Sequence, residues 1–471
     1  MPPLPPNRNG ASLRLPPRQA AVAAAPDVLV VGGGPAGLGA AMGAAQAGVE
    51  VLLVERYGFL GGNATAALVM PLMSFHTLNF RPERAGVDTL LPTDSGLGTP
   101  LIAGVLEKFL TKLVKAGGAV SPSLATGYTV PFDPEIFKLT ALEMLDEAGV
   151  HYLFHAFASG TVEQGQVEHV IFESKSGPVV VRPRMIVDCT GDGDIAAAAG
   201  AAYEFGRELD QMVQPITLMF RMTHFDKASF GKYVAEHPDQ WRGVHGLWDL
   251  VKQAAAAGSL DLAREDILFF GTPHPDEIAV NSTRIIKVSG IDVWDLSYAE
   301  WEGRRQMKAL AEFLRRDVPG FGRSFIMQSG VQVGVRETRR ITGEYRLTTG
   351  DILQARKFDD VITRNSYPID IHNPGGTGTV LRRLPDGESY DIPLRCLIPG
   401  NLQNVVVAGR CISGSHEAHS SYRVMPVSMA TGHAAGVCAA LAVRSGKTPR
   451  ELPFAKVQTE LLRQGANLGD R

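Results

Sequence analysis

The stretch that decides the fold is Asp27-Val-Leu-Val-Val-Gly32-Gly-Gly34-Pro-Ala-Gly37, near the start of the chain. Residues 27–31 form a short apolar, β-branched run that is typical of a buried parallel strand. An alanine-rich helical stretch follows the glycines and runs to Ala47, where Gly48 ends it. Residues 50–55 are again apolar and predict a second strand. Together these segments predict a βαβ unit of about 30 residues.

The glycines at 32, 34 and 37 have the spacing and the context of a dinucleotide-binding turn. They follow a predicted strand and open a predicted helix, and Glu55 ends the second strand about 20 residues further on. We expect a pyrophosphate at the helix N-terminus, beside Pro35 and Ala36, because unpaired N–H groups there favour anions. Glu55 would accept hydrogen bonds from ribose hydroxyls.

Two further segments are rich in small residues and are predicted to contact the same ligand. The first follows Glu55, and its glycine pair would let backbone pass close to a flat ring; the alternative is a plain surface turn. Its predicted contact residues are Arg56, Gly61, Gly62, Asn63 and Thr65. The second ends the buried strand at residues 185–188 and supplies Thr190, Gly191 and Asp192. Asp192 or Asp194 would either bind a sugar hydroxyl or cap a helix at residues 195–199.

A fourth segment lies near the other end of the chain. The strand-like run 404–409 ends at Gly409, and Arg410 follows it. A polar loop with His416 and His419 comes next, and a long helix begins near Met425 and Pro426. Contacts from both ends of the chain fit an extended cofactor such as FAD. The N-terminus of that helix would face the part of the flavin where reduction builds up negative charge.

These segments, together with residues 334–345 and 366–372, resemble the FAD-dependent oxidoreductase family that is related to the flavin domain of the A-type subunit of heterodisulfide reductase. The resemblance spans residues 27–443 and implies a glutathione-reductase-like FAD fold. It also implies that Gly32, Gly34, Gly37 and Glu55 lie on the adenosine and pyrophosphate side, and that residues 409–426 contact the flavin. The chain departs from that flavin protein because it has no cysteine cluster motifs.

The predicted fold class is α/β. We expect a Rossmann-like FAD-binding domain, with a parallel sheet flanked by helices and a small β-meander, and an inserted α+β substrate domain. The predicted boundaries are a flexible tail at 1–26, the two parts of the FAD-binding domain at 27–204 and 391–445, the inserted substrate or cap domain at 205–390, and a peripheral tail at 446–471.

Composition argues against several other classes. The 46 basic and 49 acidic residues give a formal net charge of −3, without the basic excess of a nucleic-acid binder. The four cysteines form no CxxC motif, which argues against a dithiol pair, an iron–sulfur cluster or a disulfide framework. No metal site and no membrane span are expected. The first 26 residues lack a signal-peptide pattern, so a cytoplasmic location is the default expectation.

Substrate chemistry points to a few charged residues. Arg336 and Arg423 suit a carboxylate, because a guanidinium group binds one through a fork of hydrogen bonds. The alternative is that residues 336–344 form a salt-bridged structural hairpin or one that contacts FAD. His372 and His416 are candidate proton carriers, although a lone histidine is more often structural.

The leading functional hypothesis is an oxidoreductase that transfers a hydride or electrons between non-covalently bound FAD and a small-molecule substrate. Two alternatives stay open. One is a flavin-bearing electron-transfer or assembly subunit that serves a protein partner, and the other is an NAD-dependent dehydrogenase. The sequence does not identify the substrate, the redox partner or the oligomeric state, and a homo-oligomer is left open.

Overall fold

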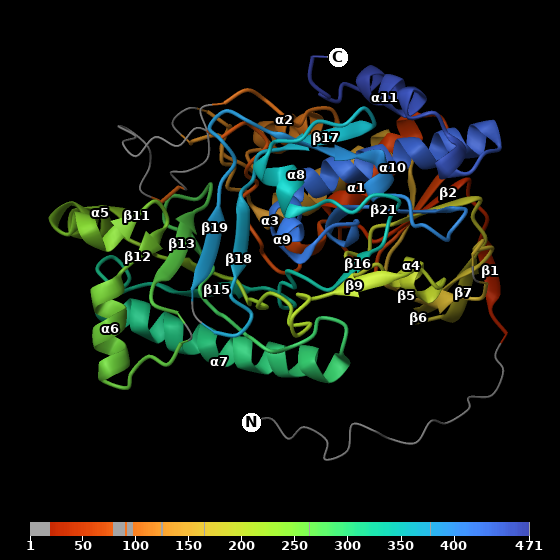
Figure 1. The fold of residues 1–471 in the computed structure, drawn as a ribbon. Coiled ribbons are helices and arrows are strands. Elements are labelled where there is room, and N and C mark those ends of the chain that lie inside the picture. Colours follow the sequence, from red (N-terminus) through yellow and green to blue (C-terminus); the bar gives the residue numbers. More distant parts are fainter. Residues whose placement is uncertain are drawn as a thin grey trace.

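The computed structural model describes residues 19–78, 90–91, 98–123, 126–163, 165–262, 264–376 and 378–470. Its central element is a five-stranded parallel sheet with the strand order β21-β8-β2-β3-β4 (Figure 1). The strands are β2 (Val28–Val31), β3 (Val51–Val54), β4 (His151–Leu153), β8 (Met185–Asp188) and β21 (Val405–Val407). All but β4 are buried along their whole length, as the continuous apolar runs predict. The predicted α/β class is confirmed.

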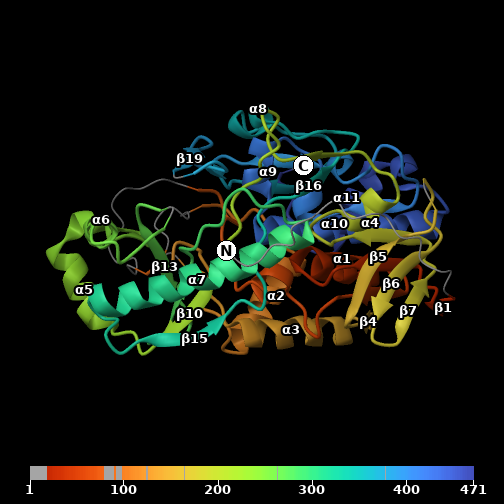
Figure 2. The same ribbon diagram turned by 90° about the horizontal axis from the view of Figure 1, so that it is seen from below.

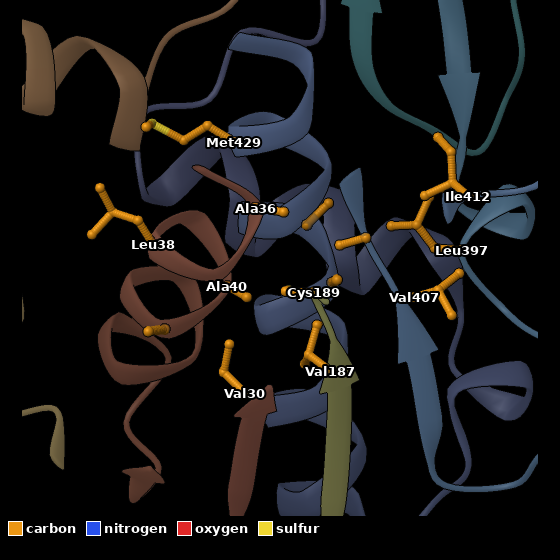
Figure 3. Packing of buried hydrophobic residues seen from close by; sticks show 14 of the residues in the cluster. Val30, Ala36, Leu38, Ala40, Val187, Cys189, Leu397, Val407, Ile412 and Met429 are labelled. Carbon is orange, nitrogen blue, oxygen red and sulfur yellow. The ribbon is translucent and has the colours of Figure 1, made fainter. Parts of the chain in front are cut away.

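Two helices from opposite ends of the chain pack side by side against this sheet. They are α1 (Pro35–Gln46) and α10 (Met425–Ser445), and glycines let their backbones touch. A Cβ added at Gly432 would lie 1.9 Å from the carbonyl oxygen of Ala36, and one added at Gly39 would lie 2.1 Å from that of Met429. Figure 3 shows Ala36 and Met429 near this contact, beside the strands that carry Val30 and Val187. The C-terminal helix is therefore held next to the N-terminal glycine turn.

Among the described residues, α10 is the helix that is long and apolar enough to cross a membrane. However, 89% of its most apolar window is buried inside the molecule, where it contacts α1, α2, β8 and β17. A helix that is apolar all round and buried on all sides is typical of a core helix as well as of a membrane span.

The predicted β-meander is present as three antiparallel strands. They are β5 (Ala156–Thr161), β6 (Val170–Ser174) and β7 (Gly177–Val181). A fourth strand, β1 (Ala21–Ala24), pairs in parallel with β7. The sequence assigned these four residues to the flexible tail; their pairing depends on a strand more than 150 residues away, which local sequence does not reveal.

A second sheet lies at the end of the molecule opposite the meander (Figures 1 and 2). It has six strands in the order β11-β12-β13-β14-β10-β15, and its neighbours pair antiparallel. The strands are β10 (Phe220–Thr223), β11 (Trp241–Arg242), β12 (His245–Gly246), β13 (Ile267–Gly271), β14 (Ile278–Val280) and β15 (Phe325–Ser329). Its helices are α5 (Lys227–Glu236), α6 (Trp248–Ala256) and the long α7 (Val293–Asp317).

This second sheet has its own hydrophobic core. Its centre is a group of aromatic side chains, namely Phe225, Phe230, Trp241, Phe269 and Phe321. The buried residues of this core run from Phe220 to Phe321, with Leu90 added, whereas Ile341 to Ile392 belong to the main core. The separate core therefore covers a shorter stretch than the predicted insertion of residues 205–390.

Short paired strands and helices complete the main domain. The strand pairs are β9 (Tyr203–Phe205) with β16 (Arg339–Ile341), β17 (Val361–Asn365) with β20 (Tyr390–Pro393), and β18 (Ile369–His372) with β19 (Thr379–Arg382). The remaining helices are α2 (Val105–Lys115), α3 (Pro134–Glu147), α4 (Asp194–Ala198), α8 (Thr349–Leu353), α9 (His416–Tyr422) and α11 (Phe454–Arg463). Val457 and Leu461 of α11 are buried, and this helix packs on α10 and β17. The segment expected to be a peripheral tail therefore contributes to the core.

Candidate functional site

The carboxyl ends of β2, β3, β8 and β21 meet at a cavity of about 240 Å³. This is the edge at which open parallel sheets bind their ligands. The predicted cofactor residues that line it are Gly32, Gly34, Pro35, Ala36, Glu55, Arg56, Gly62, Asn63, Thr190, Gly191, Asp192, Gly409, Arg410 and Met425. The predicted contacts Gly37, Gly61, Thr65 and Pro426 are not among the lining residues, whereas Arg423 is.

The glycine turn leaves open space at its middle glycine. Protein atoms exclude a side chain at the other two positions. A Cβ added at Gly32 would lie 2.6 Å from the carbonyl oxygen of Cys189, and one added at Gly37 would lie 1.8 Å from the carbonyl oxygen of Gly32. Gly34 has φ −72°, which any residue adopts, and its added Cβ would meet only the Cα of Gly62, at 3.7 Å. Its lack of a side chain thus leaves room for a ligand, beside first-turn N–H groups of α1 that have no side-chain cap.

Glu55 is oriented by backbone donors at the end of β3. Its Oε2 accepts a hydrogen bond from the N–H of Gly33 at 2.6 Å, and its Oε1 accepts one from the N–H of Tyr57 at 2.9 Å. Burial raises the pKa of this carboxyl group, and the two backbone hydrogen bonds oppose that rise. A carboxylate accepts about four hydrogen bonds. Glu55 therefore has capacity left for hydroxyl donors in the cavity.

The loop after Glu55 packs against the glycine turn backbone to backbone. Gly61 has φ +115° and donates its N–H to the carbonyl oxygen of Gly33 at 2.8 Å. A Cβ added at Gly62 would lie 2.8 Å from the Cα of Gly34. The Thr65 hydroxyl donates within the loop, to the carbonyl oxygen of Leu60 at 2.7 Å. Gly61 and Thr65 therefore shape this wall of the cavity without facing it.

The acidic loop after β8 is held by arginines. Asp192 accepts a hydrogen bond from Nη2 of Arg410 at 2.7 Å, and Asp194 accepts one from Nη1 of Arg339 at 2.9 Å. Gly193 is the N-cap of α4, and neither aspartate caps this helix through its side chain. Burial and the neighbouring carboxylates raise the pKa of Asp194 to about 6. Both carboxylates line the cavity, but ion pairs already occupy part of their hydrogen-bonding capacity.

The C-terminal segment touches the N-terminal one directly. Gly409 has φ +80°, and a Cβ added there would lie 2.9 Å from the Cβ of Ala36. Nη1 of Arg410 donates to the carbonyl oxygen of Val335 at 2.7 Å. The N-terminus of α10 has no side-chain cap, and Met425 and Ser428 of its first turn line the cavity. Segments near the two ends of the chain therefore line one cavity together.

The candidate substrate residues Arg336, Arg423 and His372 lie in one polar cluster. Nη2 of Arg423 and Nε2 of His372 lie 3.9 Å and 3.6 Å from Oδ2 of Asp370. Burial and the neighbouring Arg423 lower the pKa of Arg336 to about 9. Burial likewise lowers the pKa of His372 to about 4, so its imidazole is neutral near pH 7. Arg423 also lines the cavity, and so connects this cluster to it.

His416 lies in a helix and in an ion-pair network. The sequence predicts a polar loop around it, but Ser415 caps helix α9, which begins at His416. Its Nδ1 lies 2.9 Å from Oε1 of Glu337, which also pairs with Arg340. This arrangement matches the structural alternative for residues 336–344, because the pairs tie α9 to the segment that leads into β16. His419 is fully buried, and neither of its ring nitrogens has a hydrogen-bond partner.

Sequence reasoning missed the part of the cavity wall that comes from the middle of the chain. Gly290, Leu296, Glu300, Gln332 and Val333 line the cavity. No motif identifies them, because they reach the cavity through the placement of the loop before α7, of α7 itself and of the segment after β15.

One group of possible metal ligands occurs among the described residues, at the β5–β6 turn. Ligand atoms of Glu163, Glu168 and His169 lie within 4.8 Å of one another. The Glu163 carboxylate already accepts hydrogen bonds from the backbone N–H groups of Glu168 and His169. We therefore interpret this group as a turn held by a carboxylate.

The curated proteins that this chain resembles include two reductases of one organism. Digeranylgeranylglycerophospholipid reductase 2 of Methanopyrus kandleri is 30% identical over 177 residues, which is 37% of this chain and 40% of that protein. Digeranylgeranylglycerophospholipid reductase 1 of the same organism is 29% identical over 177 residues, 37% of this chain and 42% of that protein. The chain thus spans about two fifths of the length of these curated relatives.

Solved structures of limited similarity include a reductase-like protein and a monooxygenase. A geranylgeranyl bacteriochlorophyll reductase-like protein from Thermoplasma acidophilum has a TM-score of 0.44 and 14% identity, covering 94% of this chain and 84% of that one. The p-nitrophenol 4-monooxygenase of Pseudomonas putida has a TM-score of 0.44 and 12% identity, covering 94% and 85%.

The family model described as FAD dependent oxidoreductase matches residues 27–461, from the start of the βαβ unit to α11. This match confirms the predicted cofactor, FAD. Because it spans nearly the whole described chain, this protein belongs to the FAD dependent oxidoreductase family.

Proposed function

We propose that the chain binds FAD non-covalently and transfers a hydride or electrons between the flavin and a small-molecule substrate. The observation that carries this proposal is that one cavity is lined both by Gly34, near the N-terminus, and by Met425, near the C-terminus. An extended dinucleotide explains why two segments so distant in sequence meet there.

The N-terminal half of the cavity fits the adenosine and pyrophosphate part of the cofactor. The open space at Gly34 and the uncapped first turn of α1 suit a phosphate, since the N–H groups and the helix dipole attract anions. Glu55, held by Gly33 and Tyr57, has oxygen lone pairs left for ribose hydroxyls.

The C-terminal half of the cavity fits the flavin. Bound FAD supplies a ring that takes up or releases a hydride. The uncapped N-terminus of α10, at Met425 and Ser428, favours negative charge beside it. Arg423 adds a positive charge to the same wall. These groups would favour negative charge on a flavin ring held beside them.

The middle segment closes the cavity from the side of the second sheet. Arg56 donates from Nη2 to Oε1 of Gln332 at 2.6 Å, and the Tyr57 hydroxyl bonds to the same oxygen. The carboxylate of Glu300 accepts the N–H of Val333 at 2.8 Å. These contacts hold residues 332–333 at the cavity, where they would restrict the access of water to the reacting atoms.

The structure favours FAD over the NAD-dependent alternative. Gly62 and Gly409, from loops that an ordinary nicotinamide dehydrogenase does not need, both line the cavity. A closer relation to the flavin domain of heterodisulfide reductase is supported by the order of the motifs alone. The curated relatives are named reductases, so reduction of the substrate is the first direction to test.

The test is an absorbance spectrum of the purified protein, followed by an anaerobic screen of small molecules. We expect a flavin spectrum with one FAD per chain, release of the flavin on denaturation, and changes in flavin redox state with some of the compounds screened. Binding of NADH without uptake of added FAD would instead favour the nicotinamide dehydrogenase. Turnover that needs an added protein partner would favour the electron-transfer role.

A further inference from the structure

Three arginine side chains converge beside the cavity on the substrate side. Arg423 and Arg336 belong to the cluster around Asp370, and Arg284 reaches the same cluster from the segment after β14. Nη2 of Arg284 lies 3.3 Å from Nδ1 of His372, whose Nε2 lies 3.6 Å from Asp370. Sequence patterns do not identify Arg284, because no motif surrounds it.

These guanidinium groups retain unused hydrogen-bonding capacity. Nε of Arg423 is buried without a partner, and its Nη2 lies 3.9 Å from Asp370, beyond hydrogen-bond distance. Arg336 donates through Nη1, to Thr217 and to the carbonyl oxygen of Pro215 at 2.7 Å. Because a guanidinium carries five N–H donors, both arginines have donors that protein acceptors do not use.

The cluster also has an excess of positive charge. Three arginines lie near enough to the carboxylate of Asp370 to interact with it electrostatically, and His372 is neutral near pH 7. A further arginine nearby, Arg264, is already paired with Asp266 at 3.0 Å. Among the residues that the structure describes, two positive charges are therefore left without a carboxylate partner. Buried charges without a partner are costly, and an anion bound between them would remove that cost.

We propose that Arg284, Arg336 and Arg423 bind an acidic group of the substrate, a carboxylate or phosphate that carries up to two negative charges. The link to catalysis rests on the proposed flavin function. Arg423 lines the cofactor cavity as well as this cluster, so an acid held there has the rest of its structure directed to the flavin end of the cavity. Asp370 acts as a positioning residue, because its carboxylate attracts Arg423, at 3.9 Å, and His372, at 3.6 Å.

The test is calorimetric titration of the FAD-loaded protein with succinate and, separately, with inorganic phosphate. We expect at least one of the two anions to bind, and Arg284→Gln and Arg336→Gln each to weaken that binding by about 10-fold or more, as for loss of a hydrogen bond to a charged group. The anion that binds more tightly identifies the carboxylate or the phosphate. Arg242→Gln is the matched control, since this exposed arginine of β11 loses the same charge outside the cluster.

The proposal is overturned if wild-type protein binds neither anion, or if Arg242→Gln weakens binding as much as the cluster variants do. If a glutamine variant does not fold, Arg336→Lys keeps the charge but removes the fork, and it should still weaken binding. The flavin content of the same samples is measured independently. Full flavin occupancy without anion binding would refute this inference alone, whereas absence of flavin would refute the proposed function.

Discussion

Gly34→Ala separates the binding of the cofactor from the stability of the fold. The added Cβ would meet only the Cα of Gly62, at 3.7 Å, and the backbone at residue 34 has ordinary dihedral angles. We therefore expect the flavin-free variant to unfold at the wild-type free energy or slightly above it. The methyl group would occupy the space in which we place the pyrophosphate.

The expected loss of affinity follows from the hydrogen bonds at that turn. A hydrogen bond to a charged group contributes about 1.5–3 kcal/mol. If the methyl group displaces the phosphate from one N–H of the first turn of α1, the dissociation constant for FAD should rise about 10- to 150-fold. The larger Gly34→Val should prevent retention of the flavin.

Two assays on the same samples decide the question: chemical unfolding without flavin, and titration of the flavin-free protein with FAD. Gly37→Ala is the control, because its Cβ would lie 1.8 Å from the carbonyl oxygen of Gly32 and should destabilise the fold itself. Wild-type FAD affinity in Gly34→Ala would refute the placement of the phosphate.

Three further predictions concern the C-terminal helix and the polar cluster. Arg423→Ala should retain FAD but slow electron transfer between the flavin and the substrate; an unchanged rate in anaerobic stopped-flow would remove this residue from the substrate site. Gly432→Ala should lower the free energy of unfolding by about 1–3 kcal/mol, because its Cβ would overlap the carbonyl oxygen of Ala36, whereas Gly231→Ala in α5, with open space around it, should raise it by up to about 1 kcal/mol. The pKa of His372 is about 4 when folded against 6.5 for the free side chain, so the unfolded chain binds the proton more tightly and stability falls as the pH drops from 6.5 to 4. In urea unfolding, His372→Gln should remove up to about 3 kcal/mol of the stability that the wild-type protein loses over this pH range. An identical pH profile of stability in the variant and the wild type would contradict the prediction.

The sequence predicts the strands and the glycine turn of the cofactor site well, because each is determined by a few neighbouring residues. The apolar runs at 28–31 and 51–54, the glycine turn between them and Glu55 identify the cofactor half of the cavity. The same applies to Gly409, where a strand ends in a glycine. The close packing of α1 on α10 depends on Gly39 and Gly432. The sequence alone does not reveal this role, because it does not show that the two helices touch.

Features that depend on distant contacts were missed or misplaced. β1 is a strand because β7 offers it an edge, and α11 is in the core because its apolar side chains meet α10 and β17. His416 lies in a network with Glu337, which no local pattern reveals. Arg284 comes from the segment after β14 and Glu300 from α7, and no local pattern shows that these two segments reach the cluster and the cavity.

The most direct test of the account is backbone amide exchange of the protein with and without FAD. The two ends of the chain line one cavity, so FAD should slow exchange in residues 32–37 and in residues 409–428 of the same molecules, with the same dependence on FAD concentration. Protection confined to either segment would contradict the claim that both ends hold one cofactor.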